Sequence, residues 1–186
     1  MRRANRGFTL IEAIMVIVLI GTVAAIALPR VGVSRYQANA AARAVTGTLS
    51  YAQRTAISQQ ANINVAFDAA RRGMRVHEDR DNDLNMDPGE RVTFTPLAEG
   101  VTFGRGTAAA RPFGGADIQL TRQQAGLPVL IFRRDGTLSE EGGIYLSTIA
   151  GLAVGRATDV RAVDFTRATG RATWFSYATG AWKRGD

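Results

Sequence analysis

The feature that most constrains this chain is one long apolar run near its N-terminus. Residues 8–28 contain a single charge, Glu12, and their other non-apolar members are two threonines and one glycine. At about 1.5 Å of rise per residue, a helix of this length extends about 32 Å, close to the roughly 30 Å hydrocarbon core of a bilayer. The sequence therefore predicts a transmembrane helix over residues 8–28 that crosses the membrane once.

The charges around this run predict its orientation. Arg2, Arg3 and Arg6 precede it, and no comparable cluster follows it. By the positive-inside rule the N-terminus stays in the cytoplasm, and the rest of the chain lies in the periplasm beyond the inner membrane. The chain has no cysteine and one histidine, His77. Because disulfides, thiolate metal sites and most catalytic triads need these residues, we expect no enzyme activity.

Glu12 places an unfavourable charge within the apolar run. A carboxylate there costs about 2.5 to 3.5 kcal/mol even on the lenient insertion scale. The charge makes sense if an α-ammonium group, created by a cut just before Phe8, lies one helical turn away. The alternative is a cleavable secretory signal, with its apolar part at residues 13–23 and a small-residue site at residues 25–27. That alternative predicts a secreted binding domain and gives Glu12 no role.

The string Gly7-Phe8-Thr9-Leu10-Ile11-Glu12 resembles the class III signal of type IV pilins and pseudopilins. The resemblance implies that a prepilin peptidase cuts between Gly7 and Phe8, removing residues 1–7 as a leader, and methylates the new N-terminus of Phe8. It also implies that Glu12 pairs with the N-terminus of a neighbouring pilin or pseudopilin subunit during assembly. Such subunits are assembled at an inner-membrane platform.

The next segment, residues 29–60, has the pattern of an amphipathic helix. Small and apolar residues recur at steps of three and four, at Ala38, Ala42, Val45, Leu49, Ala52 and Ala56. Polar residues occupy the opposite face, at Arg43, Ser50, Gln53, Arg54 and Gln60. We expect the apolar stripe to cover a sheet and the polar face to meet water or a partner.

Residues 61–186 change to short alternating stretches separated by turn signals, which indicate antiparallel strands. The expected strands are 63–67, 74–77, 92–94, 129–132, 144–146 and 163–165. Residues 104–126 are rich in glycine and alanine and predict a long loop or an irregular strand. The expected fold class is α+β: a type IV pilin-like fold, with a long N-terminal helix packed on an antiparallel β-rich head.

The order of these parts extends the resemblance. Residues 49–67, 131–138, 143–146 and 160–177 are similar to the helix-to-strand passage, two strands and the terminal hairpin of the GspH/FimT family. This implies a minor pseudopilin of a type II secretion system, a structural subunit of the periplasmic pseudopilus. The alternative within the family is a FimT-like minor type IV pilin for pilus assembly or DNA uptake.

Residues 78–90 contain six of the sixteen acidic residues of the chain. Counting from Asp79, oxygen-bearing side chains fall at the positions used by calcium loops, and the candidate ligands are Asp79, Asp81, Asp83, Asp87 and Glu90. Leu84 stands where such a loop expects glycine. The alternative is a solvated hairpin tip between strands ending at His77 and beginning at Arg91. No cofactor is expected apart from this structural calcium.

Cations and aromatic rings alternate near the C-terminus, a pattern that can bind nucleic acid. The candidates are Arg167, Arg171, Trp174, Lys183 and Arg184. Some FimT-type minor pilins bind DNA through a Gly-Arg-x-Arg motif, but here residues 170–173 read Gly-Arg-Ala-Thr and lack the second arginine. We therefore favour type II secretion over DNA uptake. The structural alternative is that the rings pack the hairpin onto the helix, with the arginines in water.

Overall fold

One helix, α1 (Leu10–Gln59), contains most of both predicted N-terminal segments. The computed structural model describes residues 9–185, apart from the side chains of residues 24–32. The leader 1–7 and Phe8 lie outside the described residues. The chain divides into two units, with the boundary after Val33. The separate ranges 8–28 and 29–60 are thus parts of one continuous helix, which passes through Pro29 without a break.

In the first unit, α1 begins on Thr9, whose carbonyl oxygen accepts the N–H groups of Glu12 and Ala13 at 3.1 and 3.2 Å. The large apolar side chains described there, at residues 10–23 and at Val33, are uncovered, from 48% exposed at Val16 to 80% at Leu10. Within the described part of the chain, no helix combines the length and the apolar character needed to cross a membrane. The membrane span over residues 8–28 stays a prediction.

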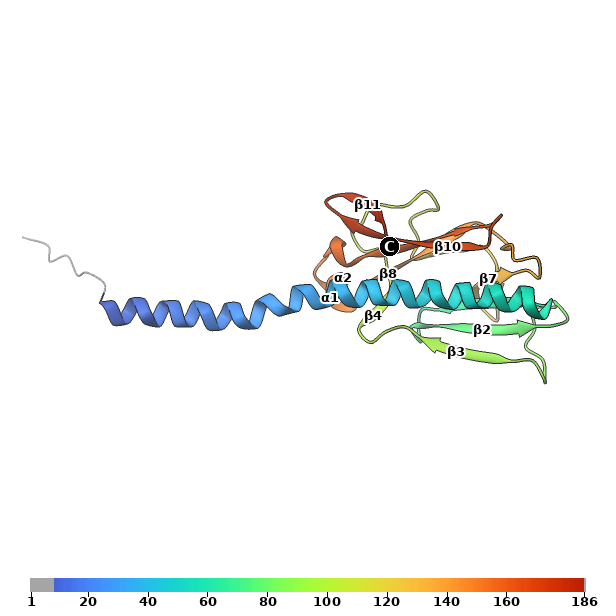
Figure 1. Cartoon of the computed structure of the whole chain (residues 1–186), viewed down its shortest axis with the longest axis horizontal. Helices are drawn as coiled ribbons and strands as arrows, with labels where there is room; N and C mark the ends of the chain where they lie inside the picture. The colour runs from blue at the N-terminus through green and yellow to red at the C-terminus, as the bar shows by residue number, and fades with distance from the viewer. Residues whose placement is uncertain (1–8, 186) are drawn as a thin grey trace, which may run out of the picture. The chain divides into compact units, whose positions relative to one another are not determined.

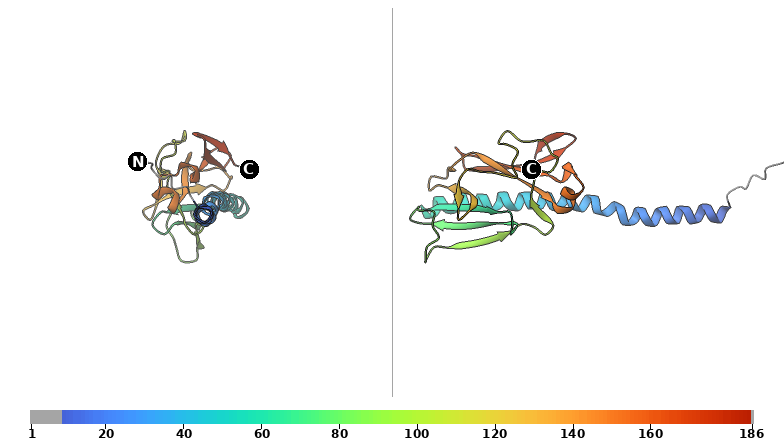
Figure 2. Two further views of the ribbon diagram at one scale, coloured as in Figure 1. Left: turned by 90° about the vertical axis from the view of Figure 1, so that its left-hand side faces the viewer. Right: turned by 180° about the vertical axis from the view of Figure 1, so that it is seen from behind.

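The second unit, Ser34 to Asp186, holds two antiparallel sheets that flank the second half of α1 (Figures 1 and 2). The first sheet has the order β3-β2-β1-β7-β6. Its strands are β1 (Asn62–Asp68), β2 (Gly73–Asp79), β3 (Val92–Pro96), β6 (Gln123–Gln124) and β7 (Leu127–Phe132). The hairpin of β1 and β2 places Val65 opposite Val76.

The second sheet has the order β11-β10-β9-β8-β4, and β5 also pairs with β8. Its strands are β4 (Val101–Phe103), β5 (Ile118–Gln119), β8 (Gly142–Thr148), β9 (Arg161–Thr166), β10 (Arg171–Ala178) and β11 (Ala181–Arg184). A short helix, α2 (Ile149–Ala153), and a 3₁₀ turn (Ala157–Asp159) connect β8 to β9.

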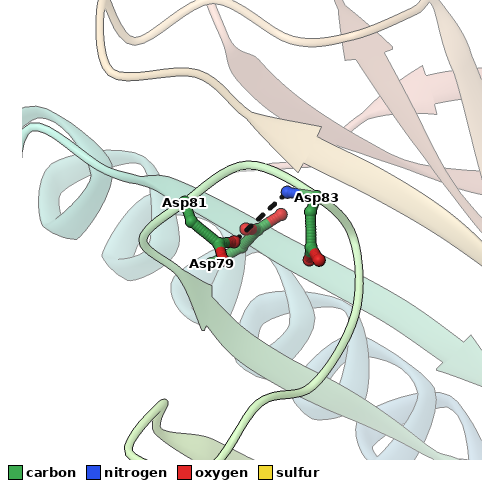
Figure 3. A group of neighbouring side chains, drawn as sticks. All are labelled: Asp79, Asp81 and Asp83. Carbon is green, nitrogen blue, oxygen red and sulfur yellow. Dashed lines mark hydrogen bonds between the residues drawn. The ribbon is translucent and has the colours of Figure 1, made fainter.

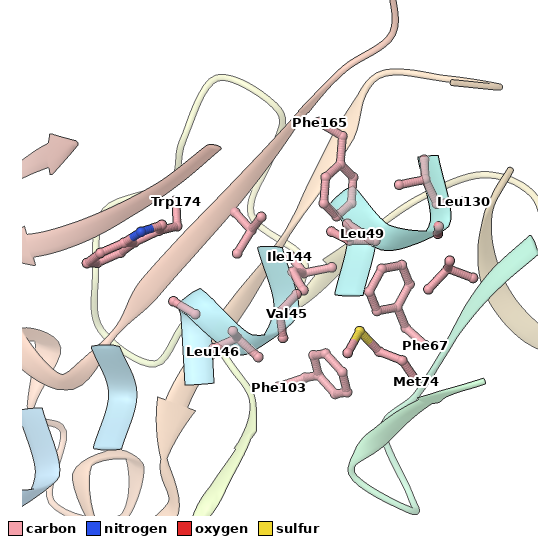
Figure 4. Packing of buried hydrophobic residues seen from close by; sticks show 14 of the residues in the cluster. Val45, Leu49, Phe67, Met74, Phe103, Leu130, Ile144, Leu146, Phe165 and Trp174 are labelled. Atoms are coloured by element: carbon pink, nitrogen blue, oxygen red, sulfur yellow. The ribbon is translucent and has the colours of Figure 1, made fainter. Parts of the chain in front are cut away.

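The core lies where α1 meets both sheets (Figure 4). All six residues of the predicted helical stripe are at most 1% exposed. Val45 and Leu49 pack in one cluster with Phe67 of the first sheet and Phe165 of the second. The rings of Phe67 and Phe165 are stacked, with centroids 5.9 Å apart. The predicted packing of α1 on a β-rich head is therefore confirmed.

Two parts of the head add to the expectation: two strands were not expected, and the irregular segment 104–126 takes a defined path. Strands β4 and β11 are additional, and residues 104–126 form an ordered strap that includes β5 and β6. Arg111 anchors the strap, because its guanidinium forms an ion pair with Asp164 and lies 3.7 Å from the ring centroid of Phe175. The hydroxyl of Tyr145 accepts the Arg111 N–H at 2.6 Å. These contacts join residues that are far apart in sequence, so no local sequence pattern predicts them.

Gln53, expected to face water or a partner, instead ties α1 to the head. Its side-chain amide donates to the carbonyl oxygens of Gly136 and Thr169, both at 2.8 Å. Gly136 lies in the turn that follows β7 of the first sheet, and Thr169 lies in the turn of the β9–β10 hairpin of the second sheet. The polar face of the helix thus contributes to the fold at this position.

Candidate functional site

The acidic loop connects β2 to β3 and gathers three of the five predicted calcium ligands. One carboxylate oxygen from each of Asp79, Asp81 and Asp83 lies within 4.8 Å of the others (Figure 3). Desolvation raises the pKa of Asp81, and the neighbouring carboxylates of Asp83, Glu90 and Asp87 add to the rise. Crowded carboxylate oxygens of this kind are the ligands that calcium prefers. These three residues could hold a cation.

The loop is closed by hydrogen bonds from its own backbone. Asp79 is fully buried and accepts the N–H of Asn82 at 2.7 Å and that of Leu84 at 3.2 Å. Leu84 has a φ of 67°. This is the left-handed conformation for which a calcium loop uses glycine at this position, so the sharp turn forms with leucine there. The side-chain amide of Asn64 donates at 2.8 Å to the same Asp79 oxygen that accepts the Leu84 N–H.

Glu90, the last predicted ligand, has protein partners of its own. One of its oxygens accepts the backbone N–H of Arg80 at 2.9 Å, and the other lies 2.6 Å from Nε2 of the buried His77. The Arg80 N–H, the His77 ring and the Asp87 N–H lower the pKa of Glu90 to about 2. Glu90 and Asp87 are outside the three-carboxylate group. The structure thus brings together three of the five candidates, and Glu90 closes the base of the hairpin.

The imidazole of His77 is held on both sides. Its Nδ1 lies 2.9 Å from the side-chain amide of Gln124, which also donates to the carbonyl of Leu84. Because an amide nitrogen can only donate, Nδ1 is the acceptor and Nε2–H is the donor to Glu90. His77 therefore joins the acidic loop to β6 and needs no catalytic role to account for its burial.

A second candidate site is an open groove between α1 and the hairpin of β10 and β11. Two adjoining hollows, of about 390 and 320 Å³, share Arg43, Trp174 and Arg184 in their linings. Arg171 lines the first hollow, and Arg35 and Arg161 line the second. We call this surface the arginine groove and define it by Arg35, Arg43, Arg161, Arg171 and Arg184. Among the described residues, no carboxylate lines either hollow.

Arg161 forms the buried end of the groove and is 3% exposed. Its Nε donates to the side-chain oxygen of Asn39 at 2.6 Å, and its Nη1 donates to the carbonyls of Thr158 and Val160. Burial lowers the pKa of Arg161 to about 10, so it still carries its charge at neutral pH. Arg161 thus adds one buried positive charge at this end of the groove, and the buried carboxylate of Asp159 interacts with it.

The five residues proposed for DNA binding are split by the structure. Arg171, Trp174 and Arg184 line the groove together, whereas Arg167 and Lys183 do not line it. Trp174 is only 8% exposed and packs in the main core, with the Arg43 guanidinium 5.7 Å from its ring centroid. The structural alternative, in which this ring packs the hairpin onto the helix, is correct for Trp174.

Sequence reasoning missed Arg35, left Arg161 out of the DNA-binding candidates although it precedes them in the same C-terminal stretch, and did not connect Arg43 with the C-terminal cations. The helical pattern does place Arg43 on the polar face of α1. What no pattern shows is that β10 and β11 lie beside that face, because these strands are more than a hundred residues away along the chain.

The N-terminal candidates are only partly described. Gly7 and Phe8, the predicted cleavage site, lie outside the described residues. Glu12 occupies the first turn of α1, three residues after Thr9, and its N–H lies 3.4 Å from the Thr9 hydroxyl. A carboxylate in a first turn also interacts favourably with the helix dipole. Its pairing with the N-terminus of a neighbour stays a prediction.

Comparison with known proteins bears on both halves of the chain. Residues 2–28 match the family model of the prokaryotic N-terminal methylation motif, and residues 41–169 match that of the type II transport protein GspH. No curated protein matched the chain. A similar solved structure is the minor pseudopilin EpsH from the type 2 secretion system of Vibrio cholerae. The two structures match with a TM-score of 0.51 and a sequence identity of 16%. The match covers 78% of this chain and 99% of the EpsH chain. The expected pilin-like fold is confirmed.

Proposed function

The chain belongs to the GspH family of type II transport proteins, and we propose that it acts as a minor pseudopilin, a structural subunit of the periplasmic pseudopilus in protein secretion. The observation that carries this proposal is the family match over residues 41–169, which covers most of the head. The pseudopilin fold of the head supports it. Catalysis has no part in the proposal.

In this proposal the N-terminal segment anchors the chain in the membrane and takes part in assembly. Its match to the methylation motif favours prepilin processing over cleavage as a secretory signal. A prepilin peptidase would cut between Gly7 and Phe8, and the mature helix would anchor the chain in the inner membrane with the head in the periplasm. The uncovered apolar side chains of the first unit suit burial in lipid or among the helices of other pilin-like subunits.

Glu12→Ala tests the assembly step. The change removes a costly charge from the apolar run, so membrane insertion should be kept, while incorporation into pseudopili should fall because the partner of the neighbour's N-terminus is gone. Sheared and cross-linked fractions from cells that express the full chain measure incorporation, and carbonate extraction measures membrane retention. Thr22→Ala, also in the apolar run, is the matched control and should assemble normally.

Intact-mass analysis of the mature chain tests the processing step. An N-methylated chain beginning at Phe8 is expected, and Gly7→Ala should leave the leader attached. A mature chain that begins at Leu28 would reject the pilin-like role and restore the secretory signal. Normal incorporation of the Glu12→Ala chain would reject the proposed pairing.

A further inference from the structure

The arginine groove carries charge that the described chain does not neutralise. Its four exposed guanidinium groups, on Arg35, Arg43, Arg171 and Arg184, form no ion pair with any residue the structure describes. Some arginines elsewhere in the head do meet carboxylates, as in the pairs of Arg111 with Asp164 and Arg156 with Asp159. Like charges gathered without counter-charge repel one another, so an anionic occupant would relieve this repulsion.

The groove is also held in place by regular structure. Arg35 and Arg43 project from α1, while Arg171 and Arg184 come from the paired strands β10 and β11. Gln53 ties α1 to the turn at Thr169, which precedes β10. Buried Arg161 joins the helix to the second sheet through Asn39 and the carbonyl of Arg35. A ligand would therefore meet guanidinium groups whose backbone positions need little rearrangement.

The shape and composition of the groove favour carboxylates of a polypeptide over nucleic acid. Its hollows, of about 390 and 320 Å³, accommodate side chains but are too small to admit a duplex. A single strand would need an aromatic face on which its bases could stack. Trp174 is largely buried, and a methyl group at Gly185 would overlap its ring, so the backbone at Gly185 covers that ring closely. Arginine forks match carboxylates in geometry and charge.

We propose that the arginine groove binds a carboxylate-rich segment of a neighbouring pilin-like subunit. This inference rests on the proposed function, which supplies such neighbours, and its basis is a preformed groove on the head whose exposed arginines are paired with no carboxylate among residues 9–185. Arg43 and Arg184, which line both hollows, form its centre.

The test uses the full chain in nonionic detergent and a short polyglutamate peptide as the probe. Binding is measured by fluorescence polarisation at increasing salt. Replacing Arg43→Gln together with Arg184→Gln should weaken binding by about tenfold or more, since two charge-assisted contacts are lost. Binding to the unchanged protein should decrease steadily with salt, because the groove is open to solvent.

The matched control is Arg133→Gln together with Arg134→Gln, which removes the same charge from exposed residues outside the groove. This control should change affinity by about twofold or less, because distant exposed charges are screened. Arg43→Lys with Arg184→Lys keeps the charge but loses the guanidinium fork, so it should retain only part of the binding. Circular dichroism and thermal melting confirm that each variant is folded.

Three outcomes would overturn the inference. The first is no binding of polyglutamate at low salt, and the second is an equal loss in the groove and control variants, which would indicate only net charge. The third is tighter binding of DNA or anionic vesicles than of the peptide, with the same dependence on Arg43 and Arg184. If the unchanged chain binds no peptide yet still enters pseudopili, the proposed function stands without this contact. Failure of incorporation in the unchanged chain would reject the proposed function itself.

Discussion

At the turn between β9 and β10, Gly170 has a φ of 66°. A methyl group there would overlap the carbonyl oxygen of Gly136 and the side-chain amide of Gln53. Gly180, in the next turn, also has a positive φ of 79° but has open space around it. The two glycines therefore separate the cost of backbone conformation from the cost of close packing.

We expect Gly170→Ala to destabilise the protein by about 2 to 5 kcal/mol, because a strained backbone and a steric overlap add together. Gly180→Ala should cost about 1 to 2 kcal/mol from the backbone alone. Urea unfolding of both variants measures the difference. Equal losses would show that the overlap at position 170 is relieved without cost.

The calcium site in the acidic loop stays a prediction, and melting experiments test it. If Asp79, Asp81 and Asp83 hold the ion, a hundredfold excess of calcium over its Kd should stabilise the protein by about 2.7 kcal/mol. Asp81→Asn combined with Asp83→Asn should abolish this response. Asp87→Asn, outside the three-carboxylate group, should keep most of it.

The calcium test has a clear negative outcome. If millimolar calcium and a chelator give the same melting temperature, the loop is a hairpin tip closed by its own hydrogen bonds. The hydrogen bonds that Asp79 accepts from the backbone N–H groups of Asn82 and Leu84 already close the loop without an ion.

At the scale of elements, α1 depends on its apolar stripe for attachment to the head. Leu49 is 1% exposed and packs in the cluster that joins both sheets. Leu49→Ala should lower the free energy of unfolding by about 2 to 5 kcal/mol, because it leaves a cavity in this cluster. Arg54→Ala, on the exposed face of the same helix, is the control and should change stability by about 0.5 kcal/mol or less.

Chemical denaturation of the full chain in detergent measures both changes. A loss as small for Leu49→Ala as for Arg54→Ala would mean that the helix and the head are held together mainly by polar contacts such as those of Gln53.

The apolar stripe of α1 was predictable because its steps of three and four match the helical period. The contacts of Gln53 were not, because they depend on two turns that are distant in sequence.

At the scale of the whole molecule, the secretion and DNA-uptake functions predict opposite results. We expect the chain to bind duplex DNA only in the non-specific range of about 10⁻⁴ to 10⁻⁶ M at physiological salt. The reasons are that Thr173 replaces the second arginine of the uptake motif and that Trp174 is buried. Deletion of the gene should abolish export by the type II system and leave transformation intact.

Far tighter DNA binding that is lost in Arg171→Ala would favour uptake instead, as would a deletion that stops transformation and leaves export unchanged. Polarisation titrations with labelled duplex, together with export and transformation assays in the same strain, distinguish the two functions.

Local pattern alone determined a large part of this protein. The apolar run, the helical stripe and most strands follow from residue spacing, because helix and strand periods depend only on neighbours along the chain. The order of these elements, together with the short string from Gly7 to Glu12, was enough to indicate the family. The three grouped aspartates were likewise predictable, since they lie within five residues of one another.

Only the tertiary structure decided which residues distant in sequence come together in sites and contacts. It placed β10 and β11 beside the polar face of α1, which brought Arg43 and Arg184 into one groove and buried Trp174. It paired Glu90 with His77, which removed Glu90 from the group of aspartates. It also made residues 104–126 an ordered strap through Arg111 and Asp164. The physical reason is that such contacts are selected by the packing of whole sheets on the helix, and no short window of sequence contains both partners.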